Sequence, residues 1–299
     1  MEESRIAFLH RLINSPSPSG FEQRAQQVIR EEMQHYTDEQ RTDVHGNVIA
    51  ALNPNANPRV MLTAHCDELG FLVRFIDEKG FIYFATIGGF DPSTLPGERV
   101  QIHTANGPIL GVIGRKPVHL LQSDERGKAP KLSEMWLDIG VNNKEEAQEL
   151  VTIGDIAVGL RGAHTSAFGV DPLIAVAVDV TFTSDHPQTS KHEIGDIRLN
   201  GGPVISIGSR INPRVYHMLI NAADEAGIAY QIDPQASGTG TDTDVIQVSR
   251  AGVATGLVSI PCRYLHTGSE IVSLKDIDEI AELLSRFVLA LDAQTNVIP

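Results

Sequence analysis

The sequence contains few cysteines and no long apolar run. Its 299 residues include only Cys66 and Cys262, which excludes a disulfide scaffold and a zinc site made of four thiolates. No stretch approaches the roughly 18 uninterrupted apolar residues of a membrane span. The acidic start Met-Glu-Glu-Ser also lacks the apolar core of a signal peptide. We therefore expect a cytoplasmic protein without a membrane partner.

Positive charge and aromatic side chains are also scarce. The chain carries 24 Lys and Arg against 38 Asp and Glu, for a formal net charge of -14. Contacts to phosphates need clustered basic side chains, so this balance argues against a nucleic-acid partner. Aromatic residues make up 5% of the chain. This disfavours a glycosidase. Such an enzyme needs two opposed carboxylates across a sugar-binding cleft, and no aromatic-rich platform for a sugar is evident in the sequence.

The hydrophobic pattern divides the chain into three parts. Residues 1–68 and 158–299 alternate helical periodicity with apolar strands, and 41% hydrophobic composition suffices for a large core. Residues 69–157 contain short β-runs separated by Gly and Pro. These runs cover 71–76, 81–84, 99–102, 109–113 and 135–139. We predict an α/β fold with a mixed, mostly parallel sheet flanked by helices and an inserted small β-barrel domain at 69–157.

Within residues 60–68, an apolar β-run carries His65 and Asp67 at its C-terminal end, two residues apart and so on the same side of the strand. In open α/β sheets, ligands bind beyond the carboxyl ends of the strands. We predict that His65 ligates a metal ion and that Asp67 orients its ring from behind. A buried His-Asp pair with a purely structural role is the alternative.

Two further apolar runs lead to potential ligands. One run ends at Asp179, and another is followed by His266. His, Asp and His at three strand ends form the ligand mix that zinc or cobalt prefers. Both cysteines lie near these histidines, but we expect them to be buried small hydrophobes rather than ligands.

Beyond these ligands, the sequence resembles a known family over nearly its whole length. It resembles the tetrahedral, dodecameric metallo-aminopeptidases, also called glutamyl or deblocking aminopeptidases. The motifs that carry the resemblance are Ser17-Pro-Ser-Gly20, Asp43-Val-His-Gly-Asn47, Ala64-His-Cys-Asp-Glu68, Ile87-Gly-Gly89, Asp138-Ile-Gly140, Val158-Gly-Leu-Arg-Gly-Ala163, Ala177-Val-Asp-Val-Thr181, Gly240-Thr-Asp242 and Ser259-Ile-Pro-Cys-Arg-Tyr-Leu-His266.

The resemblance implies a zinc-peptidase-like fold and an enzyme that removes N-terminal residues from short peptides. It implies two divalent metal ions, zinc or cobalt, with His65 and Asp179 on the first ion and His266 on the second. Asp67 would support His65, and Asp242 would lie near the substrate. Alternatively, Asp242 is a turn residue that bonds its own backbone. The inserted β-domain would form dimers that assemble into a homo-oligomeric dodecamer.

The chain departs from the family where Ala157 meets Val158. There the family has a strand-helix-strand segment that carries the Asp bridging the two ions and a Glu pair containing the general base. Loss of a general base alone costs about 10²–10⁴-fold in rate. We therefore expect at most partial metal occupancy and impaired hydrolysis. The alternative is a catalytically inactive paralogue that acts as an assembly or peptide-binding subunit.

Overall fold

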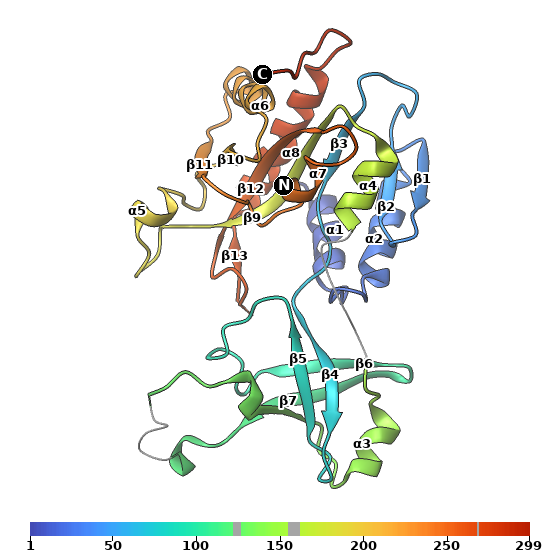
Figure 1. Ribbon diagram of the computed structural model, residues 1–299, viewed down its shortest axis with the longest axis vertical. Coiled ribbons are helices and arrows are strands. Elements are labelled where there is room, and N and C mark those ends of the chain that lie inside the picture. Colours follow the sequence, from blue (N-terminus) through green and yellow to red (C-terminus); the bar gives the residue numbers. More distant parts are fainter. Residues whose placement is uncertain (122–126, 155–161, 268) are drawn as a thin grey trace.

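The computed structural model describes residues 1–121, 127–154, 162–267 and 269–299. Two sheets of different character dominate it (Figure 1). A mixed sheet lies among helices in the upper part of the view, and an antiparallel sheet lies below it. This arrangement confirms the predicted fold class. The expected boundary between residues 157 and 158 lies outside the described residues.

The mixed sheet has the strand order β11-β10-β12-β9-β3, with β13 beside β12. Its strands are β3 (Val60–Thr63), β9 (Ile174–Phe182), β10 (Val204–Gly208), β11 (Gln231–Gln235), β12 (Ala254–Arg263) and β13 (Ile271–Val272). The pairs β3-β9, β9-β12 and β10-β11 are parallel, whereas β12 is antiparallel to β10 and β13. The sheet is therefore mostly parallel, as predicted.

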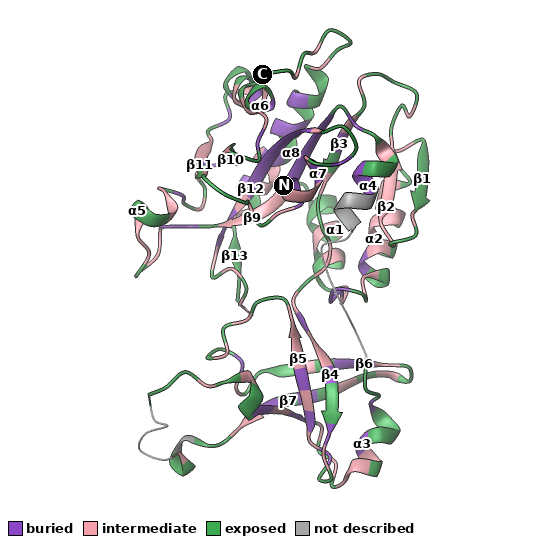
Figure 2. Cartoon of the chain, in the orientation of Figure 1, coloured by how far each residue is buried: buried purple, intermediate pink, exposed green. Residues whose placement is uncertain are grey.

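The antiparallel sheet has the strand order β4-β5-β8-β7-β6 and curls into a half-barrel. Its strands are β4 (Gly70–Ile76), β5 (Ile82–Ile87), β6 (Arg99–Thr104), β7 (Gly107–Arg115) and β8 (Met135–Asp138). Each strand overlaps one of the five predicted β-runs, although the bounds differ by up to three residues. The sheet has its own core, in which Ile76, Ile82 and Ile113 are fully buried. Its strands carry buried residues, which are purple in Figure 2.

Helices cover the mixed sheet, and a separate hairpin lies beside them (Figure 1). The helices of this part are α1 (Glu3–Ile13), α2 (Gln23–Met33), α4 (Gly162–Val170), α5 (Lys191–Ile194), α6 (Pro213–Ala226), α7 (Thr243–Ile246) and α8 (Leu274–Leu289). The hairpin consists of β1 (Glu39–Thr42) and β2 (Val48–Ala51). A further helix, α3 (Lys144–Leu150), packs on β4 in the lower part.

Alternation along β9 assigns its residues to the two faces of the mixed sheet. Ile174 and Val176 pack in the core that α6 and α8 form on one face. Ala175 and Met61 of the neighbouring β3 pack instead in a cluster that includes residues of α4 and α7. Since side chains alternate along a strand, Thr63 and Asp179 also belong to the α4/α7 face. This face carries the candidate site.

The structure also departs from the expectations. Asp179 does not end its strand, because β12 extends beside β9 and continues the ladder to the pair Phe182 and Cys262. His65 is not on a strand either, since β3 ends at Thr63. The sequence pattern did not predict β10 and β11. Within the described residues, no helix combines the length and apolar character needed to cross a membrane.

A buried carboxylate at the start of α8 allows a test of the fold. Asp276 is fully buried and accepts backbone N–H bonds from Asn200 at 2.8 Å and Gly202 at 3.0 Å. Replacing Asp276 with Ala leaves two amides without a partner, so we expect a loss of about 3 kcal/mol in the free energy of unfolding. Urea denaturation measures this loss. The exposed helix variant Glu282→Ala is the control, and an equal effect of both variants would contradict the assignment.

Candidate metal centre

His65 lies between two carboxylates. Its Nδ1 is 2.9 Å from Oδ1 of Asp67, and its Nε2 is 3.6 Å from Oδ1 of Asp179. The second distance exceeds a hydrogen bond, so we describe it as an ion pair. One carboxylate thus lies beside each nitrogen of the His65 ring.

A short segment after α1 holds Asp67 and its neighbour Glu68. Ser19 donates its hydroxyl to Oδ2 of Asp67 at 2.5 Å. The backbone N–H of Ser17 donates to Oε1 of Glu68 at 2.7 Å, and the Glu68 N–H donates to the Ser17 carbonyl at 3.0 Å. The Ser-Pro-Ser-Gly segment therefore fixes the carboxylate that supports the His65 ring. Sequence reasoning missed this role of Ser19, although the motif itself was visible.

Asp242 lies close to the same site. It is buried, and Thr63 donates its hydroxyl to Asp242 Oδ2 at 3.1 Å. Its side chain makes no capping bond to α7. Asp244 instead accepts the backbone N–H groups of Thr239 and Gly240. The turn role considered for Asp242 thus belongs to Asp244.

The charges in this cluster shift the pKa values of its members. The pKa of His65 is raised to about 11, first by Asp179 and then by Asp67, against an opposing effect of burial. The pKa of Asp67 is lowered, chiefly by its hydrogen bond with His65. Burial raises the pKa of Asp242, and the nearby charges of Asp179 and Asp67 add to this effect. Without a metal ion, His65 is therefore an imidazolium at neutral pH.

His65 and Asp179 are arranged as two ligands of one ion would be. An ion with tetrahedral geometry and bonds of about 2 Å sets its ligands roughly 3.3 Å apart, close to the 3.6 Å observed. Asp67 behind the ring is the usual partner of a metal-bound histidine. Among the described residues, however, no three His, Cys, Asp or Glu side chains are grouped to hold an ion. The roles of His65 and Asp179 as metal ligands therefore stay predictions.

His266 is the third predicted ligand. It follows β12 in a left-handed conformation with φ of 64°, and its backbone N–H donates to Glu270 Oε1 at 2.6 Å. Nδ1 of its ring lies near Gly89, which follows β5. Nowhere in the described part of the chain does a hydrogen bond or ion pair join His266 to His65 or Asp179. Its role as a ligand stays a prediction.

The two cysteines are unsuited to thiolate ligation. Burial raises the pKa of both Cys66 and Cys262 to about 11, and nearby carboxylates add to the rise. Both side chains therefore remain thiols at neutral pH. Cys262 is buried, as expected, whereas Cys66 is half-buried.

Comparison with known proteins identifies the family to which the chain belongs. The chain belongs to the M42 glutamyl aminopeptidase family, whose pattern matches residues 46–158 and 157–283. It is 30% identical to the lysyl aminopeptidase of Pyrococcus furiosus, over 92% of this chain and 94% of that protein. That alignment spans 331 residues and is longer than the chain itself. The relative therefore has residues without a counterpart here.

Two solved structures share the fold. The TET aminopeptidase of a marine-sediment archaeon of the Thaumarchaeota matches with a TM-score of 0.91 and 29% identity, over 97% of both chains. The TET1 peptidase of Pyrococcus horikoshii matches with a TM-score of 0.82 and 25% identity, over 96% of this chain and 99% of that one. The latter assembles into a tetrahedron or a large octahedral shell. These matches agree with a peptidase fold along the whole chain.

The charge arrangement around His65 predicts a specific titration behaviour. Because Asp179 is the larger cause of the raised pKa, we expect Asp179→Asn to lower the pKa of His65 more than Asp67→Asn does. Because the pKa of His65 is higher in the folded chain than in the unfolded chain, protonation of the ring stabilises the metal-free fold below pH 6.5. This stabilisation is lost as the pH rises toward about 11. NMR titration of the imidazole in EDTA measures the pKa of His65, and urea denaturation at several pH values measures the change in stability. An unshifted His65 pKa near 6.5 in the parent chain would contradict the geometry.

Proposed function

We propose that this chain has the framework of a cytoplasmic, metal-dependent aminopeptidase that removes N-terminal residues from short peptides, and that hydrolysis is impaired in the present form. The observation that carries this proposal is the pair of His65 and Asp179, with Asp67 behind the ring, in a chain of the M42 family. The family sets the reaction class, and this pair supports a metal at the site.

The chain's own residues would prepare the metal site as follows. His65 and Asp179 would hold one divalent ion, zinc or cobalt, which when bound supplies Lewis acidity and lowers the pKa of a water. Asp67 accepts the Nδ1 proton of His65, so Nε2 is the nitrogen that would bind the ion in place of its proton. Asp242 would lie beside the peptide, with Thr63 fixing its carboxylate. His266 would belong to a second ion.

Two observations support impaired activity. The family pattern matches in two pieces that meet at residues 157 and 158. The described residues also supply only part of a ligand set. A segment with further ligands and the general base, absent after Ala157, accounts for both. Such a chain would hold metal weakly, because too few ligands converge on it.

We further propose that copies of this chain assemble through residues 69–157, as dimers that build a dodecamer. Phe75, Leu110 and Val112 of the half-barrel sheet are 49%, 60% and 40% exposed. In this proposal, these exposed apolar side chains contribute to the interface between copies. The assembly of the P. horikoshii relative supports a closed shell here.

Restoring the absent segment tests the proposed activity. We expect that inserting the corresponding segment of the P. furiosus enzyme between Ala157 and Val158 raises the hydrolysis of aminoacyl p-nitroanilides at least about 100-fold with zinc or cobalt present, since a general base and a bridging ligand return together. Steady-state kinetics of the two chains measure the gain.

The restored chain with His65→Ala is the matched control, because it keeps the segment but loses one predicted ligand. It should be inactive. A restored chain that folds, binds metal and hydrolyses no aminoacyl substrate would refute the aminopeptidase proposal.

Metal stoichiometry tests the second candidate, an inactive assembly or peptide-binding subunit, which the incomplete ligand set favours. We expect the present chain to bind fewer than two ions tightly and the restored chain to bind two. Because His65 is protonated at neutral pH, its ion should displace about one proton. Calorimetry in two buffers with different ionisation enthalpies measures both quantities. Two tightly bound ions in the present chain would count against the inactive-subunit candidate.

A further inference from the structure

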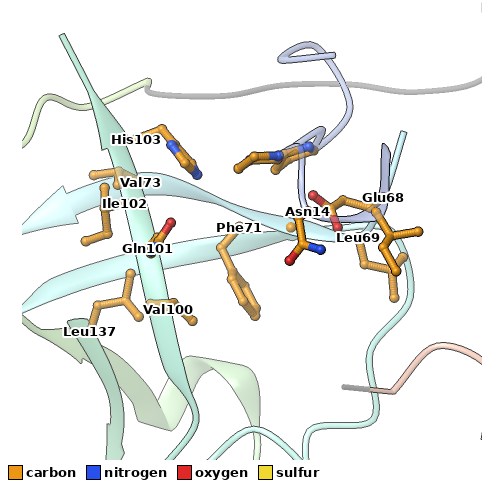
Figure 3. Close-up of a pocket in the computed structure, with 14 residues that line it drawn as sticks. Asn14, Glu68, Leu69, Phe71, Val73, Val100, Gln101, Ile102, His103 and Leu137 are labelled. Atoms are coloured by element: carbon orange, nitrogen blue, oxygen red, sulfur yellow. The ribbon is translucent and has the colours of Figure 1, made fainter. Parts of the chain in front are cut away.

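A cavity of about 380 Å³ lies between the segment that follows α1 and the half-barrel sheet (Figure 3). This volume falls within the range of small-ligand sites. Phe71, Val73, Ile102 and Leu137 of the sheet provide an apolar wall, and prolines of the α1 segment line the cavity from the other part of the chain. The cavity is distinct from the His65 site and was not predicted from the sequence.

Glu68 supplies the charge of this cavity. It carries the single full charge among the lining side chains, all of which belong to the described residues. Its Oε1 accepts the backbone N–H of Ser17 at 2.7 Å, which fixes the orientation of the carboxylate. Within the part of the chain that the structure describes, its other oxygen has no hydrogen bond. An oriented carboxylate beside an apolar wall favours a cation that carries an apolar group.

His103 is a further polar group of the cavity wall, in addition to Glu68, Asn14 and Gln101 (Figure 3). It is 9% exposed, and Phe21 packs on its ring at 5.2 Å between centroids. Its Nδ1 has no hydrogen-bond partner among the residues that the structure describes. Burial lowers its pKa, so the ring is neutral at neutral pH and does not repel a cation held by Glu68. Buried polar groups in proteins nearly always have a hydrogen-bond partner. An imidazole without such a bond is unusual unless a ligand supplies one.

We propose that this cavity binds an ammonium group joined to an apolar side chain, as found in an apolar amino acid or in the first residue of a peptide. The ammonium group would contact Glu68, the apolar side chain would lie on Phe71 and Ile102, and a polar group of the ligand would meet His103. This site requires neither metal nor hydrolysis. It therefore goes beyond the peptidase proposal and can be tested without it.

Binding of L-leucinamide to the full chain in EDTA tests the site, because chelation removes metal binding and turnover. We expect saturable binding by calorimetry, no binding of N-acetyl-L-leucinamide, and a loss of about five- to tenfold in affinity for Glu68→Gln, which keeps an oxygen for Ser17 but removes the charge. Glu98→Gln, on an exposed carboxylate next to β6, is the matched control and should bind as the parent chain does.

Val100→Phe adds bulk to the cavity without a polar change and should also weaken binding. Circular dichroism establishes that each variant is folded. Equal affinity for the acetylated compound, or unchanged binding by both folded cavity variants, would overturn the proposal, as would absence of leucinamide binding. Comparing the affinities for free leucine and for Leu-Gly-Gly shows whether the ammonium group comes from a free amino acid or from the first residue of a peptide. Tighter binding of the peptide assigns the site to peptide N-termini, and tighter binding of leucine assigns it to the free amino acid.

Discussion

The parallel pairing of β3 with β9 is the constraint on which the candidate metal centre depends. Thr63 lies opposite Ala177 in this ladder. His65 and Asp179 each follow one of these partners by two residues, so a single register brings the imidazole and the carboxylate together. A shift of one residue would move every side chain of β3 to the opposite face. The buried packing of Met61 against α4 and α7 opposes such a shift, because it requires this face to point inward.

Much of this framework could be predicted from the sequence, because strand patterns and strand ends leave a visible signal. The continuous apolar run before Asp179 predicts a buried strand, and Asn212 followed by Pro213 predicts the start of α6, where the Asn212 side chain accepts N–H bonds. Short strands such as β10 leave a weaker signal. Strand ends are also hard to predict, since the length of β9 depends on its neighbour β12.

Contacts between distant segments could not be predicted in this way. The hydrogen bond from Ser19 to Asp67 joins residues 48 positions apart, and that from Thr63 to Asp242 joins residues 179 apart. No local pattern specifies such pairs. The same limit explains the exchange of roles between Asp242 and Asp244. Both are acids in a Gly/Thr-rich loop, and only the tertiary position of β3 decides which of them faces the backbone and which faces Thr63.

The electrostatics of the site connect its metal-free and metal-bound forms. Asp67, Asp179 and Asp242 together place excess negative charge around one imidazole. A proton on His65 offsets part of this charge when no ion is present, and a divalent ion would replace that proton. Proton and metal thus compete for the same nitrogen, so acidification should weaken metal binding. The neighbouring Glu68 is fixed by the same Ser17 to Ser19 segment that fixes Asp67. Movement of this segment would therefore disturb both the imidazole of His65 and the Glu68 carboxylate that lines the cavity.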